Sequence, residues 1–338
     1  MTSPRPPSPR PPEVVGGAAA WVGEQIAADH DWIHRLDDVD LVIEHARGLA
    51  ASIRDGERGL PDIGRADVDL APVAELAAGI RAALVDGRGF ALVRGLPVAD
   101  LDDVEHQVLA WMIGVHVGAP LHQNAARDVL IHVRDQGKSF DEFGVRAYET
   151  NADLDYHTDS SDVVALYCLR PAMEGGTSTI VSSTAVHDEI VRRRPDLAAL
   201  LHEPWPIVNP VDGSVTHTPI CALATGGSLF TRYGRKYTEL APIESPDVAP
   251  LTTDQVAVLD LFDEVTRSPG MALDMNFQPG DIQFLDNTKI MHARTEYVDW
   301  PEPSRRRELL RMWLVYRDDI GLPGVFRDVG FVSRSIAT

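Results

Sequence analysis

Apolar residues in the first third of the chain recur every three to four positions. This spacing appears in segments 18–36, 38–56 and 71–89, the last of which ends at Gly87 and Gly89. A period near 3.6 residues indicates amphipathic helices, and glycine is a common stop signal. We therefore expect residues 15–60 to be mainly helical, followed by another helix that ends before Gly87.

The remainder of the chain is dominated by short apolar runs rich in β-branched residues, which predict strands. Helical spacing returns over residues 104–118, 183–201 and 252–268. Strands are expected within residues 89–98, 129–133, 154–170, 175–183, 206–213, 216–234, 271–295 and 305–318. This order favours a mainly β fold with α-helices: a double-sheet jelly roll with helices packed outside it.

Pro-rich sequence at the start, MTSPRPPSPRPPE, predicts a disordered tail over residues 1–14. Residues 15–338 show neither an internal repeat nor a linker, so we expect one domain with an N-terminal helical region. Its oligomeric state cannot be inferred from these patterns.

Composition narrows the class of partner. The 338 residues are 44% hydrophobic, which is enough for a full core, and the formal net charge is −20. Such a charge argues against nucleic acid and anionic membrane surfaces as partners, since both are bound through Lys and Arg. Only two cysteines are present and no apolar run approaches the roughly 20 residues of a membrane span. A small-molecule partner and a reducing, cytoplasmic setting are expected.

The segment LDYHTDSSDVVALYCLR contains the most specific chemical signal, His157-Thr158-Asp159. On an extended backbone, residues two apart project to the same side, so this imidazole and carboxylate could bind one cation. Two histidines and one carboxylate with open positions form the face that selects non-haem Fe(II) for oxygen chemistry. The best candidate for the third ligand is His292, in IMHARTEY.

A second triplet of the same type, His187-Asp188-Glu189, lies in a segment with helical spacing. With 12 histidines and 51 acidic residues, about two such triplets are expected by chance. Positions i and i+2 of a helix do not face each other, so this triplet cannot chelate and is expected on the surface.

Five ordered segments together resemble the TauD/TfdA-like Fe(II)- and 2-oxoglutarate-dependent dioxygenases and their clavaminate-synthase-like relatives. They are GFALVRGLP, YHTDSSDVVALYCLRP, EGGTSTIVSS, FQPGDIQFLDNTKIMH and SRRRELLRMWL. The resemblance implies a double-stranded β-helix with a lid insertion between core strands. It also implies an iron site made by His157, Asp159 and His292, with 2-oxoglutarate and O₂ as co-substrates.

Oxidation of an unactivated C–H bond, most simply its hydroxylation, with release of succinate and CO₂, is the activity that this resemblance implies. Because halogenating members replace the carboxylate ligand by a small residue, Asp159 favours hydroxylation, desaturation, cyclisation or oxidative cleavage over halogenation. The motifs are most similar to members from bacterial specialised metabolism, so a biosynthetic intermediate is the expected substrate.

For the distal carboxylate of 2-oxoglutarate, the family uses an arginine on the last core strand, and the spacing fits Arg307. Arginine suits this task because its planar fork pairs both carboxylate oxygens. Arg311, four residues later, supports that pocket or meets the substrate. A hydroxyl after Gly-Gly touches the same carboxylate, with Ser178 preferred and Thr177 as the alternative.

Substrate-facing positions are less well specified. The candidates are Arg311, Arg232, Asn151, Asn124 and Ser160. The last four could equally be loop caps or solvated polar residues, whereas the segment ELLRMWL around Arg311 is too apolar for a solvated face. Arg235, Lys236 and Arg294 are expected at the surface.

Three alternatives to this activity remain open. The first is a cupin-like protein that binds metal or a small acid without turnover, and the second is a different metal-dependent reaction such as isomerisation. The third is a catabolic dioxygenase of sulfonates or aryloxyacids.

Overall fold

The computed structural model describes residues 12–139, 145, 147–209, 213–224 and 226–327. Most of the expected tail, residues 1–11, lies outside the described residues, so its disorder stays a prediction. In the described part of the chain, no helix has both the length and the apolar composition needed to cross a membrane.

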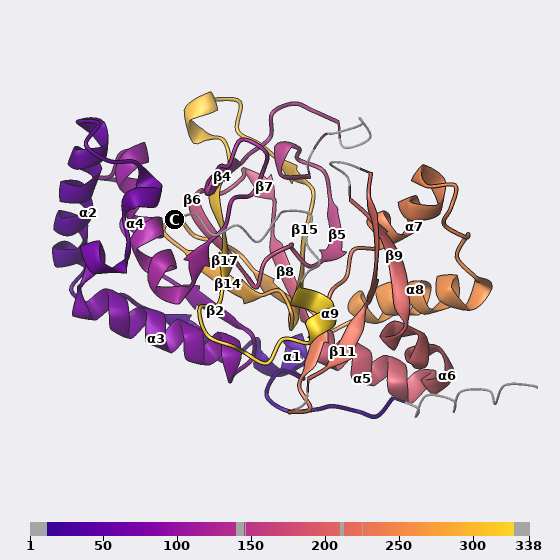
Figure 1. Cartoon of the computed structure of the whole chain (residues 1–338). Coiled ribbons are helices and arrows are strands. Elements are labelled where there is room, and N and C mark those ends of the chain that lie inside the picture. The colour runs from indigo at the N-terminus through magenta and orange to yellow at the C-terminus, as the bar shows by residue number, and fades with distance from the viewer. Residues whose placement is uncertain (1–11, 140–144, 146, 210–212, 225, 328–338) are drawn as a thin grey trace, which may run out of the picture.

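A seven-stranded sheet forms one half of the core (Figure 1). Its path runs β1-β2-β14-β6-β17-β3, and β4 also pairs with β17. The strands are β1 (Ile33–His34), β2 (Phe90–Val93), β3 (Ala119–Pro120), β4 (Leu130–Val133), β6 (Val163–Arg170), β14 (Ile282–Asp286) and β17 (Glu308–Val315). Strands from both ends of the chain thus meet in one sheet.

The second sheet has four strands in the order β13-β8-β15-β5. They are β5 (Leu154–His157), β8 (Ser178–Ser182), β13 (Leu273–Met275) and β15 (Ile290–Arg294). A hydrophobic cluster joins the two sheets, with Phe90, Val164 and Trp313 from the first and Ile180 and Ile290 from the second. The expected jelly-roll core is confirmed.

Period-two alternation along β17 explains how one strand serves two cores. Leu310, Met312 and Leu314 belong to the cluster on the helical side of the large sheet. Trp313 and Val315 belong to the cluster between the sheets. Successive side chains of a strand point to opposite faces, so an almost continuously apolar strand must be covered on both.

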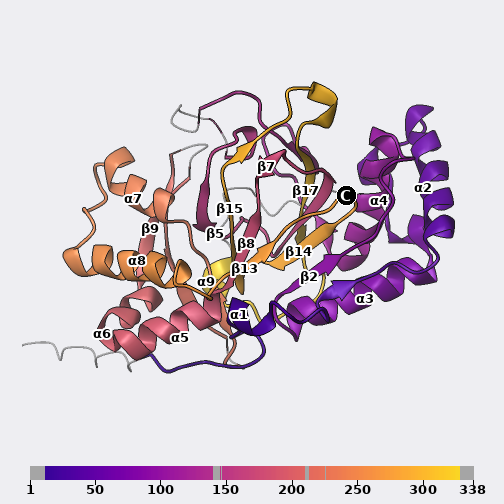
Figure 2. The ribbon, with the colours of Figure 1, turned by 180° about the vertical axis from the view of Figure 1, so that it is seen from behind.

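Helices cover both outer faces (Figures 1 and 2). The large sheet is covered by α2 (Val39–Arg54), α3 (Ala71–Val85) and α4 (Asp103–Val117), which share its hydrophobic cluster. The small sheet is covered by α5 (Ser183–Arg193), α6 (Pro195–Ala198) and α8 (Thr253–Thr266), whose cluster includes Val181 of β8 and Met291 of β15.

A long insertion, residues 183–272, separates β8 from β13. Besides α5, α6 and α8 it contains α7 (Arg235–Glu244) and two antiparallel pairs of strands. These are β9 (Pro204–Val208) with β10 (Val215–Pro219), and β11 (Cys221–Leu223) with β12 (Leu229–Thr231). Helix α8 begins at a capping box in which the side chains of Thr252 and Gln255 each accept a hydrogen bond from the other's backbone N–H group.

Short elements complete the fold. Strand β7 (Glu174–Gly175) pairs with β16 (Tyr297–Val298), while α1 (Gly23–Ile26) and α9 (Gly324–Arg327) are single turns of helix. Two expectations were wrong. Segment 18–36 forms only α1 and β1, because β1 pairs in parallel with β2 and thereby extends the large sheet. Residues 235–244, expected among strands and turns, form α7.

The second His-x-acid triplet is not at the surface. His187 and Asp188 are each 1% exposed, because α5 lies between the small sheet and the N-terminal segment. The Asp188 carboxylate accepts hydrogen bonds from the backbone N–H groups of Val15 and Gly16, both at 2.8 Å. This pair therefore attaches the start of the chain to the insertion.

The turn formed by residues 279–281, just before β14, is a tight contact between distant segments. Gly280 has a φ of +90°, and a Cβ at this position would lie 2.0 Å from the carbonyl oxygen of Leu96. The buried carboxylate of Asp281 accepts two hydrogen bonds from Arg94, at 3.0 and 2.7 Å. Only glycine combines this backbone angle with so close an approach.

Replacing Gly280 by alanine should therefore lower the free energy of unfolding by at least about 2 kcal/mol, because strain and a backbone clash add. Urea denaturation measures the change. Gly48→Ala is the matched control: Gly48 lies in α2, and a Cβ there would meet nothing within 4 Å, so the helix should gain up to about 1 kcal/mol. A Gly280→Ala protein as stable as the wild type would contradict the packing described for this turn.

Candidate metal centre and cavity

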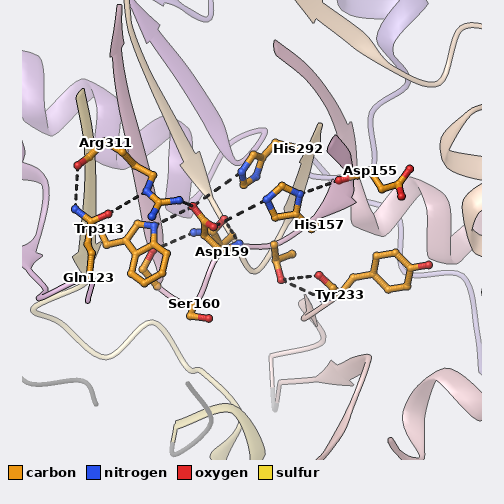
Figure 3. Close-up of polar contacts among 12 residues, drawn as sticks. Gln123, Asp155, His157, Asp159, Ser160, Tyr233, His292, Arg311 and Trp313 are labelled. Atoms are coloured by element: carbon orange, nitrogen blue, oxygen red, sulfur yellow. Dashed lines mark hydrogen bonds and ion pairs between the residues drawn. The ribbon is translucent and has the colours of Figure 1, made fainter. Parts of the chain in front are cut away.

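His157 and His292 are brought together by strand pairing. The two residues are directly opposite in the antiparallel pair β5–β15, and their ring centroids are 4.4 Å apart. They come from segments far apart in the sequence, so neither ring could be placed next to the other by local structure. Figure 3 shows both imidazoles pointing toward Asp159.

Asp159 does not lie on a strand, contrary to the expectation that the whole triplet is extended. Strand β5 ends at His157, and the next residues form a loop. Two tertiary hydrogen bonds hold this loop: Thr158 N–H donates to the Tyr233 carbonyl at 2.9 Å, and Asp159 N–H donates to Asn287 Oδ1 at 3.1 Å. The approach of Asp159 to the histidines therefore depends on these contacts and not on strand alternation.

One ligand atom from each of His157, Asp159 and His292 lies within 4.8 Å of the others. Each Nε2 is 4.0 Å from a carboxylate oxygen of Asp159: Oδ1 for His157 and Oδ2 for His292. The Nδ1 of His157 is 2.8 Å from the backbone carbonyl of Asp155, a contact that fixes Nδ1 as the protonated nitrogen. The lone pair of Nε2 is therefore available to a metal ion.

The charge state of this group also suits a divalent cation. Burial by itself raises the pKa of Asp159, but the charge of Arg311 and the two imidazoles outweigh it and hold that pKa below the usual value. Burial, reinforced by the neighbouring His157, lowers the pKa of His292 to about 3. An ionised carboxylate and a neutral imidazole are the forms that bind metal.

His157, Asp159 and His292 are called the metal group below. Three further side chains support its carboxylate, Asp159 (Figure 3). Trp313 Nε1 donates to Asp159 Oδ2 at 2.9 Å, and an Arg311 nitrogen lies 3.5 Å from the same oxygen. Gln123 in turn accepts from Arg311 Nε at 3.0 Å and donates to the Arg311 carbonyl at 2.9 Å. Trp313 follows Arg311 by two positions on β17, so strand alternation could have identified it, whereas Gln123 gave no sequence signal.

The three candidate ligands line a cavity of about 700 Å³. The same cavity is lined by five of the predicted site residues: Ser160, Ser178, Arg232, Arg307 and Arg311. The insertion contributes much of the remaining wall, through Ile207, Arg235, Lys236, Tyr237, Leu240 and Ile243. The cavity is large enough for two small ligands beside the metal group.

Arg307 is 3% exposed, and within the described part of the chain its Nη1 has no hydrogen-bonding partner. Burial lowers the pKa of its guanidinium. Gly176 allows this packing: it has a φ of +68°, and a Cβ there would lie 3.1 Å from Arg307 Nε. Nearby, Ser178 Oγ donates to Gln283 Oε1 at 3.2 Å.

Three sequence candidates lie outside the cavity wall. Thr177 donates its hydroxyl proton to Asn276. Asn124 caps its own loop through Asp128, and Asn151 donates to the carbonyl of Tyr297. Each of these side chains has a local structural role instead of facing the cavity.

Two of the three basic residues expected at the surface are placed otherwise. Arg294 is only 6% exposed, because it follows His292 by two positions on β15 and therefore faces the same side of the sheet. Arg235 is half-buried and forms ion pairs with Glu239, Asp260 and Asp263. Lys236 is exposed, as expected.

The chain matches one protein family and is similar in sequence to individual enzymes. The profile described as "Taurine catabolism dioxygenase TauD, TfdA family" matches residues 55–313. FR-33289 synthase of Streptomyces rubellomurinus is 28% identical over 319 residues, covering 89% of this chain and 90% of that protein. Uridine-5'-phosphate dioxygenase of an Amycolatopsis species is 24% identical over 244 residues, covering 67% and 85%.

Among solved structures, an asparagine oxygenase in complex with Fe(II), hydroxyasparagine and succinate has a TM-score of 0.65. It is 18% identical, and the match covers 84% of this chain and 93% of that one. The non-haem iron oxygenase OrfP, in complex with Fe, succinate and hydroxyarginine, has a TM-score of 0.63 at 16% identity, with coverage of 85% and 94%. These likenesses establish a shared fold.

The hydrogen bond from Trp313 to Asp159 should strengthen metal binding, because outer contacts that orient a ligand contribute about 10- to 100-fold in metal affinity. Trp313→Phe should therefore weaken Co(II) binding about tenfold, measured by titration of the cobalt absorption bands. Trp32→Phe is a suitable control, since Trp32 Nε1 is buried without a partner among the described residues. Equal cobalt affinity in Trp313→Phe and the wild type would show that this contact does not orient the carboxylate.

Proposed function

Because the chain belongs to the TauD, TfdA family of dioxygenases, we propose that His157, Asp159 and His292 bind Fe(II) beside a 2-oxoglutarate site. The enzyme then hydroxylates an unactivated C–H bond of a small molecule and releases succinate and CO₂. The observation on which this proposal rests is the convergence of two imidazoles and one carboxylate in the wall of a large cavity.

The donor set fits the metal. Two histidines and one carboxylate on one side of an ion are typical of non-haem Fe(II) oxygenases, which keep the remaining positions for co-substrates. When bound, iron supplies the oxidising chemistry: O₂ converts 2-oxoglutarate into succinate and CO₂, and its other oxygen atom enters the C–H bond. The presence of a carboxylate at position 159 fits hydroxylation and not halogenation.

The protein's own contribution is orientation. The Asp155 carbonyl keeps the proton of His157 on Nδ1, so that Nε2 faces the metal position. Trp313 and Arg311 hold the Asp159 carboxylate from the side opposite the histidines. Since Arg311 is already engaged with Asp159 and Gln123, it acts as a positioning residue for the metal site and for the near end of 2-oxoglutarate.

Arg307 is the anchor for the distal carboxylate of 2-oxoglutarate, with Ser178 beside it. A buried guanidinium with an unpartnered nitrogen is costly unless an anion pairs with it. The apolar surroundings, in particular Leu166, Phe277 and Leu309, strengthen such a pair by excluding water.

For the substrate, the insertion provides most of the remaining cavity wall. Arg232 donates to Ser160 Oγ at 3.3 Å, next to the metal group, and both residues line the cavity. They are suited to an acidic or polar group on a biosynthetic intermediate of bacterial specialised metabolism. Such a substrate agrees with the names of the relatives, one a synthase and another a dioxygenase of a nucleotide. We propose that this insertion, which lies between core strands, provides the lid that the resemblance implies.

The setting proposed for this reaction is the cytoplasm, where a supply of 2-oxoglutarate and a reducing environment keep Fe(II) sites active. Both cysteines, Cys168 and Cys221, are free and buried, which agrees with a chain that needs no disulfide.

Turnover of 2-oxoglutarate tests the proposal directly. Purified protein supplied with Fe(II), 2-oxoglutarate and O₂ should form succinate, slowly alone and faster with the correct substrate in a screen of candidates. His157→Ala, Asp159→Ala and His292→Ala should each lose iron binding and succinate formation by at least about 100-fold, because each removes a metal ligand. Asn124→Ala is the control, since Asn124 lies outside the cavity. A protein that binds Fe(II) and 2-oxoglutarate but forms no succinate with any candidate would instead be a binding protein.

Arg307→Ala should raise KM for 2-oxoglutarate by about 10- to 100-fold, the value of one charge-assisted hydrogen-bonded contact, with a smaller effect on kcat. Initial rates of succinate formation at varied 2-oxoglutarate measure both constants. Arg305→Ala, which removes an exposed arginine that stacks on Trp300, should leave them unchanged. An unchanged KM in Arg307→Ala would place the distal carboxylate elsewhere.

A further inference from the structure

A second buried arginine, Arg294, lines the cavity beside Arg307. It lies on β15 two residues after His292, and its register partner on β8 is Ser178. His292, Arg294 and Ser178 all contribute to the cavity wall. Arg294 therefore lies next to the residues proposed for the distal end of 2-oxoglutarate.

Among the described residues, one of the three guanidinium nitrogens of Arg294 has hydrogen-bonding partners. Nη2 donates to the carbonyls of Thr150, at 2.9 Å, and Ala152. Nε and Nη1 are buried and have no hydrogen-bonding partner among the described residues. Two donors thus remain after the structural contact is made.

The side chains of Arg294 and Arg307 lie on the same aromatic ring. The guanidinium carbon of Arg294 is 5.0 Å from the ring centroid of Tyr297, and that of Arg307 is 4.9 Å from it. The two charges are therefore no more than about 10 Å apart. Within the described chain, neither arginine forms an ion pair with a carboxylate.

Two buried cations this close repel each other, and burial removes the water that would screen them. The Tyr297 ring offsets a part of this cost through cation–π contact with both guanidiniums. An arginine guanidinium stays charged at neutral pH, so neither residue relieves this repulsion by losing its proton. Such an arrangement is stabilised most by a bound anion.

We propose that Arg294 is a second guanidinium for the distal carboxylate of the co-substrate, acting together with Arg307. This inference rests on the proposed function and adds a residue that sets the preference for a 2-oxo acid with a second carboxylate. The structural alternative is that Arg294 only holds residues 150–152. That role explains Nη2 but leaves the other two buried nitrogens without a purpose.

The test compares two ligands that differ only at the distal end. 2-Oxopentanoate has the same five-carbon chain as 2-oxoglutarate, but its fifth carbon is a methyl group where 2-oxoglutarate has the distal carboxylate. Isothermal titration of anaerobic, Fe(II)-loaded protein gives Kd for each, and their ratio measures recognition of the distal carboxylate alone. Arg294→Gln keeps a donor for the carbonyls of residues 150 and 152 but removes the charge.

We expect Arg294→Gln to lower the preference for 2-oxoglutarate over 2-oxopentanoate at least tenfold, mainly through weaker 2-oxoglutarate binding. Arg294→Lys, which restores a positive charge, should recover part of that preference. Arg192→Gln is the control, because Arg192 is exposed on α5. The Arg192→Gln protein should bind both ligands with the same Kd as the wild type. A purely structural role would weaken both ligands equally, and an unchanged ratio in Arg294→Gln would overturn the proposal.

Two further outcomes are also decisive. If Arg294→Gln does not fold, Arg294→Lys answers the question: its single ammonium cannot serve both the carbonyls and the ligand, so the preference should fall at least threefold. A lysine variant with the wild-type ratio would overturn the inference. If the wild-type protein itself binds no 2-oxoglutarate, the proposed function fails, which is a different result from a failure of Arg294 alone.

Discussion

The pairing of β15 with β5 is the constraint on which the site depends. Because His292 lies directly opposite His157, the two imidazoles are placed by backbone hydrogen bonds and not by side-chain flexibility. A slip of one residue would turn His292 to the outer face of the small sheet, where Met291 packs against α5 and α8. The register that brings the metal ligands together is therefore the same one that buries Ile290 between the two sheets and Met291 against the helices.

Charge in the cavity is distributed unevenly. Around Asp159, one carboxylate is balanced by Arg311 and fixed by Trp313, so this group is complete except for a metal ion. Around Tyr297, two guanidiniums have no ion pair with a carboxylate of the described residues. A divalent cation at one end and a dicarboxylate at the other would complete both, which is why the co-substrate assignment and the metal assignment support each other.

The insertion between β8 and β13 contributes residues to the cavity wall, and none of them is a candidate metal ligand. It is connected to the rest of the molecule by the Tyr233 carbonyl, which accepts from Thr158 beside the metal ligands, and by the contact of Asp188 with residues 15 and 16. The asparagine oxygenase and OrfP share the fold of this chain at 18% and 16% sequence identity.

The sequence by itself determined the jelly-roll class, most strands and helices and the three candidate ligands, because these follow from local periodicity and short ordered motifs. Tertiary structure alone decided that Asp159 reaches the histidines from a loop, that Asp188 is buried, and that Arg294 faces the cavity. It also decided that Gln123 supports Arg311 across 188 residues of chain. Burial and long-range pairing depend on which segments meet, and local patterns do not contain that information.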